Sequence, residues 1–293
     1  MSGPDIIVVG GQTASGKSAL AMQLARDHGG EIVGADSRQL YRGLPIASAG
    51  PNDQERAEIP HHLYESVDPA HSTLTAGAFL DAADAAVDDI RRRGKCAIIV
   101  GGTGLYLRAW RLGLADGPPS NPAMRAALQR DLQEQGLAAL VARLRLHLAD
   151  VDDRVDIHNP VRVLRALEMV DAGVDLTSQD IGRLLARPPR SPAATASWLL
   201  VEPEPAVVEG AIVTRTRRMF DHGIVEEALA LRATLPPDHP LLETMGVKEA
   251  LDVADTRCGV DDAVAAVIAR TRQYARRQRT WFRKEPWWTR TAA

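Results

Sequence analysis

A glycine-rich segment near the start of the chain, residues 10–18 (GGQTASGKS), constrains the fold more than any other feature. Every fixed position of the phosphate-loop pattern G-x-x-x-x-G-K-[ST] is filled, by Gly11, Gly16, Lys17 and Ser18. The apolar run over residues 6–9 predicts a buried strand before the loop, and residues 19–26 predict a helix after it. A strand, this loop and a helix in succession are typical of parallel α/β proteins that bind a polyphosphate.

The loop also predicts how a phosphate compound would be held. Successive backbone N–H groups and the N-terminus of the following helix form a concave site for anions. Lys17 adds a positive charge, and the Ser18 hydroxyl is placed to ligate a Mg²⁺ ion that bridges phosphate oxygens. The pattern does not indicate which phosphate compound is bound.

The charge of the chain is unevenly distributed. The formal net charge of the 293 residues is only -3, yet residues 270–290 hold eight Lys or Arg against the single acid Glu285, which favours an anionic partner. Cys96 and Cys258 have no metal-site spacing, so we expect a reducing compartment and no structural metal. The sequence shows no leader pattern and no apolar run of membrane-spanning length, which predicts a soluble, cytoplasmic protein.

Strand-like runs and helical patterns alternate along much of the chain. Amphipathic helical patterns lie between the first three of four apolar runs, which cover residues 5–9, 31–35, 97–100 and 198–201. Such alternation after a phosphate loop predicts an α/β fold like that of phosphate-loop NTPases, a parallel sheet flanked by helices. Two long helical stretches, about 206–234 and 261–284, follow the last run.

An insertion is predicted between two turn-rich segments, residues 117–122 and 187–192. Leucines recur at helical spacing over residues 122–149, residues 161–171 repeat the pattern, and no strand-like run occurs between the two segments. We therefore expect an all-helical insertion domain formed by residues 118–194. The core domain would consist of residues 1–117 and 195–293 and would include the basic C-terminal helix.

Asp36 lies where the strand predicted over residues 31–35 ends, at the same edge of the sheet as the phosphate loop. A carboxylate beside bound phosphates can hold the metal ion or accept a proton from an acceptor substrate. Asp and Ser are also favoured helix N-caps, so Asp36 or Ser37 could instead begin a helix. The spacing alone favours neither function over the cap.

Glycines follow the strand predicted over residues 97–100, in the sequence GGTGLY at residues 101–106. Most nucleoside triphosphate hydrolases have a metal-binding acid at the end of this strand. Glycine here permits close approach of the backbone to a ligand, and Thr103 offers a small hydroxyl. A tight turn into a helix over residues 105–112 explains the same residues.

The last helical stretch interleaves its arginines with Tyr274, Trp281, Phe282, Trp287 and Trp288. These side chains can contact phosphates and stack on bases, or they can form a solvated basic face with aromatics in the core. His61 and His62 suggest a metal site, but adjacent side chains point apart and no further ligand is suitably spaced. We therefore expect no metal at this pair.

Eight sequence segments between residues 11 and 283 resemble those of a known family and occur in the same order as in that family. They are GQTASGKS, ADSRQLYRGLPIASA, IPHHLYESVDP, AIIVGGTGLYLRA, RVLRALE, RTRRMFDHGIVEEAL, TMGVKEAL and TRQYARRQRTWFR. Through them the chain resembles the bacterial tRNA dimethylallyltransferases, also called tRNA isopentenyltransferases or IPP transferases. The resemblance covers nearly the whole chain, and several of the strings are specific to this family.

The resemblance implies transfer of a dimethylallyl group from dimethylallyl diphosphate to N6 of the adenosine 3′ of the anticodon (position 37), in tRNAs that read codons beginning with U. Mg²⁺ and the loop would neutralise the leaving diphosphate. The lone pair of the adenine amino group is delocalised, so a base must take its proton, and Asp36 is the candidate. By resemblance, Thr103 lies beside the reacting groups and Arg215 holds the diphosphate.

The resemblance also implies which residues bind each substrate. The diphosphate would be held by Gly11, Thr13, Ala14, Ser15, Gly16, Lys17, Ser18 and Arg215, and the metal ion by Ser18. The anticodon stem-loop of the tRNA would contact Asp36, Ser37, Arg38, Gln39, Thr103, Arg162, Arg165, Lys248, Arg276, Arg277 and Arg279. The target base would leave its stack to enter the site, and the helical insertion would clasp the stem. We expect a monomer that does not bind membranes.

Two segments depart from the family pattern. Val161 stands where many members have Gln or Lys, and residues 243–249 (ETMGVKE) lack the Gln and Tyr of the family string QAIGYKE. We therefore expect the tRNA contacts of these segments to differ from those of the family.

Three other functions share part of this signature: isopentenyl transfer to free adenine nucleotides, phosphorylation of a small metabolite, and RNA binding with a vestigial loop. The helical insertion and the basic C-terminal stretch disfavour the first. The missing acid after Val100 disfavours the second, and the intact Lys17, Ser18 and Asp36 disfavour the third.

Overall fold

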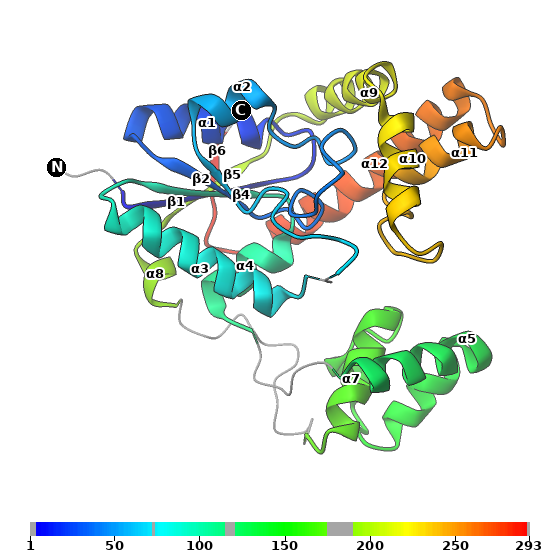
Figure 1. Ribbon diagram of the computed structural model, residues 1–293. Helices are drawn as coiled ribbons and strands as arrows, with labels where there is room; N and C mark the ends of the chain where they lie inside the picture. The colour runs from blue at the N-terminus through cyan, green and yellow to red at the C-terminus, as the bar shows by residue number, and fades with distance from the viewer. Residues whose placement is uncertain (1–3, 72–73, 115–120, 175–189, 292–293) are drawn as a thin grey trace. The chain divides into compact units, whose positions relative to one another are not determined.

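A parallel β-sheet organises the core of the chain (Figure 1). The computed structural model describes residues 4–71, 74–114, 121–174 and 190–291. The sheet has the order β3-β2-β4-β1-β5-β6, and every neighbouring pair is parallel. Its strands are β1 (Ile6–Gly11), β2 (Glu31–Gly34), β3 (His61–His62), β4 (Ala97–Gly101), β5 (Ser197–Val201) and β6 (Thr289–Thr291). All six strands therefore end at the same edge.

The four strands predicted from apolar runs are confirmed, and two edge strands were missed. β1 lies between β4 and β5, and its Ile6, Val8 and Val9 are fully buried, which explains a continuous apolar run. β3 and β6 are only two and three residues long and consist of polar side chains. Such short edge strands carry no apolar run in the sequence.

Helices cover both faces of the sheet, as predicted. In Figure 1, α1 and α2 lie over one face, and α3, α4 and α8 lie over the other. Met22 and Ala25 of α1 pack on Ile7 and Ile98 of the strands. The bounds of these helices are α1 (Lys17–His28), α2 (Asp53–Glu58), α3 (Ala76–Arg92), α4 (Gly104–Leu112) and α8 (Ser191–Ala194).

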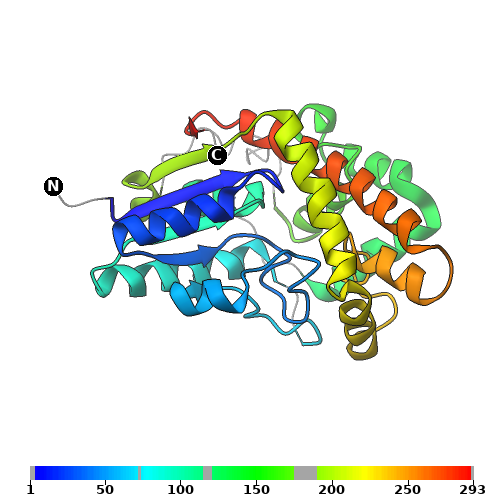
Figure 2. The same ribbon diagram turned by 90° about the horizontal axis from the view of Figure 1, so that it is seen from above.

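Four further helices stand beyond the carboxyl ends of the strands (Figure 2). They are α9 (Pro205–Asp221), α10 (Ile224–Thr234), α11 (Val247–Ala254) and α12 (Val260–Arg283). The single stretch expected over about 206–234 is wrong, because Gly223 has a φ of 94° and separates α9 from α10. A backbone conformation that glycine adopts without strain thus ends one helix and starts the next.

The chain divides into two compact units, Met1–Arg111 with Arg190–Ala293, and Leu112–Pro189. The described part of the second unit contains α5 (Pro122–Arg145), α6 (Val151–Arg154) and α7 (Pro160–Asp171). Leu128, Leu140 and Leu144 of α5 pack with Val163 and Leu167 of α7 in a core of their own. The expected helix over 122–149 stops earlier, at Arg145, and is interrupted at Gly136, whose φ is 79°. The turn-rich segments at 117–122 and 187–192 lie mostly outside the described residues.

Within the described residues, no helix combines the length and the apolar character needed to cross a membrane.

Candidate active site at the carboxyl ends of the strands

The phosphate loop connects β1 to α1 in the geometry that its sequence predicts. Gly16 has a φ of 87°, in the left-handed region that favours glycine, and α1 begins at the next residue. Gly11 has no room for a side chain, because a Cβ there would lie 3.0 Å from the Val201 carbonyl oxygen and 2.6 Å from Ser15 Oγ. The Ser15 hydroxyl is buried and has no hydrogen-bond partner within the described protein. The loop thus offers an unpaired polar group beside its tightest turn.

Lys17, Asp36 and Arg215 come together from three separate elements. Lys17 Nζ donates a hydrogen bond to the Gln12 carbonyl oxygen at 3.4 Å. Desolvation lowers the pKa of its ammonium group to about 8; the Asp36 carboxylate opposes this shift and the Arg215 guanidinium adds to it. Burial likewise lowers the pKa of Arg215, and again Asp36 opposes the shift. Two cations and one carboxylate therefore share a single electrostatic environment.

Asp36 follows β2 and ends up in a turn. Its Oδ1 accepts a hydrogen bond from the Arg38 N–H at 3.0 Å, and residues 37–40 form a turn without a helix. The N-cap hypothesis is therefore wrong, because no helix starts at Asp36 or Ser37. A Cβ on Gly102 would lie 3.4 Å from Asp36 Oδ2, so the second carboxylate oxygen lies over the end of β4.

Thr103 links the β4 end to the Asp36 turn. Its Oγ1 accepts a hydrogen bond from the Ser37 N–H at 2.9 Å, and its own N–H donates to the Ala35 carbonyl at 3.4 Å. The expected turn into a helix is also present, because Thr103 immediately precedes α4 and accepts a hydrogen bond from the Tyr106 N–H. The side chain of Thr103 thus holds the backbone next to Asp36.

A small cavity of about 70 Å³ adjoins these groups. Thr13, Asp36 and Arg215 are among its polar lining residues, and the buried Arg215 Nε has no hydrogen-bond partner within the described protein. Ala47, Met219, Met245 and Val267 contribute apolar side chains to the lining. A lining that combines charged groups with apolar side chains suits a small ligand with an anionic end and a hydrocarbon end.

Two residues that position this site were missed in the sequence. Gln278, buried on α12, accepts a hydrogen bond from the Thr13 N–H at 2.8 Å and donates one to the Gly102 carbonyl at 2.7 Å. Glu227 on α10 accepts hydrogen bonds from the Ile46 and Ala47 N–H groups at 2.7 and 2.8 Å. The available signal was the buried stripe of α12, in which Gln278 is a polar residue at helical spacing from Ala275 and Phe282.

The basic C-terminal stretch is less unbalanced in space than along the chain. Its arginines at 270, 272 and 283 form ion pairs with Glu249, Glu209 and Glu202, respectively, and Arg279 lies 3.7 Å from Glu202. Arg276 and Arg277 are exposed on α12, and Arg277 lies over the Tyr274 ring. The count of eight bases against one acid therefore overstates the positive charge, because distant acids pack beside the helix.

Of the aromatic residues of this stretch, Phe282 is buried, the three tryptophans are half-buried and pack against other residues, and Tyr274 lines the cavity. Trp288 packs edge-on against Phe282 and Trp198, with ring centroids 5.5 and 5.1 Å apart. Trp287 also packs against Trp198, at 6.3 Å. Gly104 lies against the Trp281 ring, which a Cβ would approach to 2.2 Å.

The other predicted tRNA contacts form ion pairs within their own units. Arg162 and Arg165 are on α7 in the second unit, where they lie 3.6 and 3.2 Å from Asp156 and Glu168. Lys248 forms an ion pair with Glu243 at 2.6 Å.

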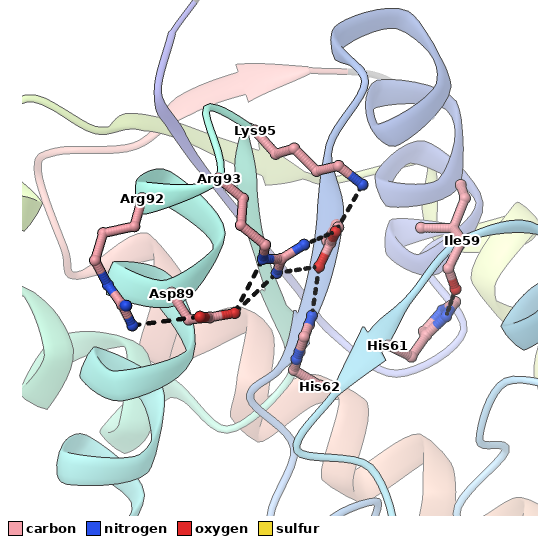
Figure 3. Close-up of polar contacts among 8 residues, drawn as sticks. Ile59, His61, His62, Asp89, Arg92, Arg93 and Lys95 are labelled. Atoms are coloured by element: carbon pink, nitrogen blue, oxygen red, sulfur yellow. Dashed lines mark hydrogen bonds and ion pairs between the residues drawn. The ribbon is translucent and has the colours of Figure 1, made fainter.

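Gln39 and the paired histidines have roles within the core unit. Gln39 donates to the Ser48 and Ala49 carbonyls, which holds the loop that lines the cavity. His62 hydrogen-bonds the buried Glu31 at 2.7 Å, whereas His61 hydrogen-bonds the Ile59 carbonyl (Figure 3). No cluster of three metal-ligating side chains occurs among the described residues.

Glu31 begins β2, whereas Asp36 follows its other end. Arg93 and Lys95 also contact the Glu31 carboxylate, and these partners hold its pKa far below the usual range (Figure 3). This cluster of Glu31, His62, Arg93 and Lys95 is therefore structural and lies apart from the phosphate loop.

Comparison of the sequence with known proteins agrees with this geometry. The family model described as IPP transferase matches residues 39–285. A tRNA dimethylallyltransferase of Deinococcus radiodurans is 40% identical over 290 residues, which are 97% of this chain and 92% of that protein. A tRNA dimethylallyltransferase of Anaeromyxobacter sp. (strain Fw109-5) is 41% identical over 284 residues, 96% of this chain and 92% of that protein.

Solved structures are similar over almost the whole chain. A full-length tRNA isopentenylpyrophosphate transferase from Bacillus halodurans matches with a TM-score of 0.69 and 27% identity, over 99% of this chain and 90% of that chain. A eukaryotic dimethylallyltransferase acting on tRNA matches with a TM-score of 0.80 and 24% identity, over 99% of this chain and 74% of that chain, and supports the fold alone. From the fold, the site and these similarities, the chain belongs to the IPP transferase family, the tRNA dimethylallyltransferases.

Proposed function

We propose that this site transfers the dimethylallyl group of dimethylallyl diphosphate to N6 of adenosine 37 in tRNAs that read codons beginning with U. The observation that carries the proposal is the electrostatic coupling of Lys17, Arg215 and Asp36 beside a cavity that Asp36 and Arg215 line together with apolar side chains. Two cations suit a diphosphate, and one carboxylate suits the proton that the adenine amino group must lose.

The diphosphate would bind at the phosphate loop. Its oxygens would face Lys17, the N-terminus of α1 and the unpaired Arg215 Nε, and the hydroxyls of Thr13 and Ser15 add further donors. The dimethylallyl end would lie against apolar lining residues of the cavity such as Met219. These cations lower the free energy of the departing diphosphate as the C–O bond breaks.

A Mg²⁺ ion fits this arrangement. Ser18 is exposed at the N-terminus of α1, where its hydroxyl can serve as one ligand. Mg²⁺ commonly combines one or two protein ligands with substrate phosphate oxygens and water, so it does not need a cluster of acids. When bound, the ion would add positive charge at the leaving diphosphate.

The acceptor would react on the Asp36 side of the cavity. As the bond from N6 to the allylic carbon forms, the diphosphate takes the electron pair of the C–O bond and Asp36 takes a proton from N6. Thr103 would keep Asp36 in place through its hydrogen bond from the Ser37 N–H. Ser37, Arg38 and Gln39 would contact the extruded nucleotide.

The remaining tRNA contacts are proposed for the exposed face of α12 and for the helical unit. Arg276, Arg277 and Arg279 would follow phosphates of the anticodon stem, and Arg162, Arg165 and Lys248 would contact it elsewhere. We propose that the enzyme acts as a monomer in the cytoplasm, where its tRNA substrates are found. Sedimentation with and without tRNA measures the oligomeric state.

The proposed reaction is tested by mass spectrometry of nucleosides from tRNA incubated with the protein, dimethylallyl diphosphate and Mg²⁺. We expect N6-isopentenyladenosine at position 37, with AMP unmodified under the same conditions. Prenylation of AMP in preference to tRNA would overturn the choice of acceptor. ATP-dependent phosphorylation of a small metabolite without prenyl transfer would overturn the reaction class.

The pKa of Lys17 predicts how the use of dimethylallyl diphosphate depends on pH. Because the pKa of Lys17 is lowered to about 8, its ammonium group is protonated and charged in the free enzyme below pH 8 and becomes a neutral amine above pH 8. We expect kcat/KM for dimethylallyl diphosphate to fall about tenfold per pH unit well above pH 8. The Lys17→Arg variant should lack this limb, since arginine stays protonated. An identical limb in both proteins would assign the titration to another group.

The exposed α12 arginines predict a salt-dependent share of tRNA affinity. Replacing both Arg276 and Arg277 by Gln should reduce the slope of log affinity against log salt by about two and weaken binding by about tenfold. The matched control replaces Arg272 and Arg283 by Gln, because Glu209 and Glu202 already neutralise these arginines. Equal losses in both double variants would place the phosphate contacts elsewhere.

A further inference from the structure

Gln278 is the buried amide of a helix whose neighbouring polar residues are largely exposed. Only 6% of it is accessible, although it lies between Arg277 and Arg279 in the basic stretch. Two of its hydrogen bonds lead away from its own helix: Oε1 accepts from the Thr13 N–H and Nε2 donates to the Gly102 carbonyl, and the side chain also hydrogen-bonds Tyr274 of α12. Thr13 and Gly102 are 265 and 176 positions away in the chain.

These two contacts join the two halves of the site. Thr13 belongs to the phosphate loop and lines the cavity beside Arg215. Gly102 immediately precedes Thr103, whose hydroxyl holds the Ser37 backbone next to Asp36. A Cβ on Gly102 would lie 2.6 Å from Gln278 Nε2 and 3.4 Å from Asp36 Oδ2. The Gln278 amide and the Asp36 carboxylate therefore both lie close to Gly102.

The chemistry of the bridge suits a primary amide. One end of the side chain must accept from an N–H and the other must donate to a carbonyl, and a carboxamide does both within one planar group. A carboxylate would place a second acceptor against the Gly102 carbonyl, and an apolar side chain would leave a buried N–H and a buried C=O without these partners. The two directional hydrogen bonds of Gln278 therefore fix the distance between the loop of Thr13 and the loop of Gly102 more tightly than packing alone would.

We propose that Gln278 is a positioning residue for the transfer reaction: it sets the separation between the loop that holds the diphosphate and the Thr103–Asp36 segment that receives the adenine. The proposal rests on the proposed function. Gln278 is not among the residues that line the cavity, so it would act through Thr13 and Gly102. Misplacement of reacting groups by about 1 Å can cost about 10²-fold in rate, so loss of the bridge should affect the transfer step more than substrate binding.

The test uses the full-length protein and two substitutions. Gln278→Met keeps the length of the side chain and removes both hydrogen bonds, and Gln278→Glu keeps the acceptor for the Thr13 N–H but loses the donor to Gly102. Gln273→Met, at an exposed site of the same helix, is the control. For Gln278→Met we expect single-turnover transfer at saturating substrates to fall by about 10²-fold, with dissociation constants for tRNA and dimethylallyl diphosphate within about threefold of the parent.

The pH dependence of Gln278→Glu separates positioning from packing. Because the site is buried, the pKa of a carboxyl placed there is raised above its ordinary range. The protonated carboxyl can again donate to the Gly102 carbonyl, so the ratio of variant to parent rate should rise as the pH falls from 8 to 5. This comparison remains available if Gln278→Met does not fold. A flat ratio, a parental rate in Gln278→Met, or losses confined to substrate affinity would each overturn the proposal. Failure of the parent itself to prenylate tRNA would instead overturn the proposed function.

Discussion

Replacing Asp36 by Asn is expected to lower the rate of dimethylallyl transfer by about 10²-fold or more while both substrates still bind. The amide keeps the size of the carboxylate, and its oxygen can still accept the hydrogen bond from the Arg38 N–H. What is lost is the negative charge that receives the proton from N6. The measurement is single-turnover transfer at saturating tRNA and dimethylallyl diphosphate.

The control for this variant is Asp68→Asn. Asp68 accepts a hydrogen bond from the N–H two residues ahead, at 2.9 Å, just as Asp36 does, but it is absent from the cavity. Because Asp36 also favours the protonated form of Lys17, the assay belongs at pH 7, below the Lys17 pKa of about 8. A near-parental rate for Asp36→Asn would refute its role as a base, and a loss traced to tRNA affinity would make it a recognition residue.

Removal of the Lys17 side chain should have the second large effect. Lys17→Ala is expected to reduce transfer by about 10²- to 10³-fold, because the ammonium group stabilises charge that develops on the departing diphosphate. Ser18→Ala should also lose most activity if its hydroxyl is a ligand of Mg²⁺. Binding of tRNA should survive in both variants, as measured by filter retention without the donor.

The Lys17→Arg variant is the control for Lys17→Ala, because it keeps a positive charge at this position. Arginine preserves a cation but changes its geometry, so an intermediate rate is expected. If Lys17→Ala abolished tRNA binding and left the affinity for dimethylallyl diphosphate intact, the loop would hold a different ligand from the one proposed.

The local features of the site were readable in the sequence because each depends on residues close together in the chain. The phosphate-loop pattern predicted the strand, the turn and the helix around Lys17, and the end of the second strand placed Asp36 at the same edge. The apolar runs predicted the four main strands, since a buried parallel strand is apolar on both faces. Arg215 could be named only through the family resemblance, because nothing in its local spacing distinguishes it from other arginines of α9.

Only the tertiary structure decided which polar groups meet across long separations. It showed that Glu202, Glu209 and Glu249 neutralise arginines of α12, which a local count of charges cannot register. It also excluded the helix cap, one of the two alternatives left open for Asp36, because the residues after Asp36 form a turn whose backbone hydrogen-bonds Thr103 from another strand end.

Sequence alone thus determined the strand, loop and helix of the phosphate-loop pattern, the parallel core and the family, since local pattern and chain order specify them. The tertiary structure decided that Gln278 bridges Thr13 and Gly102 and that Arg215 faces Asp36 and Lys17. The physical reason is that hydrogen bonds and charge interactions depend on distance in space, whereas periodicity reports only which face of an element is buried.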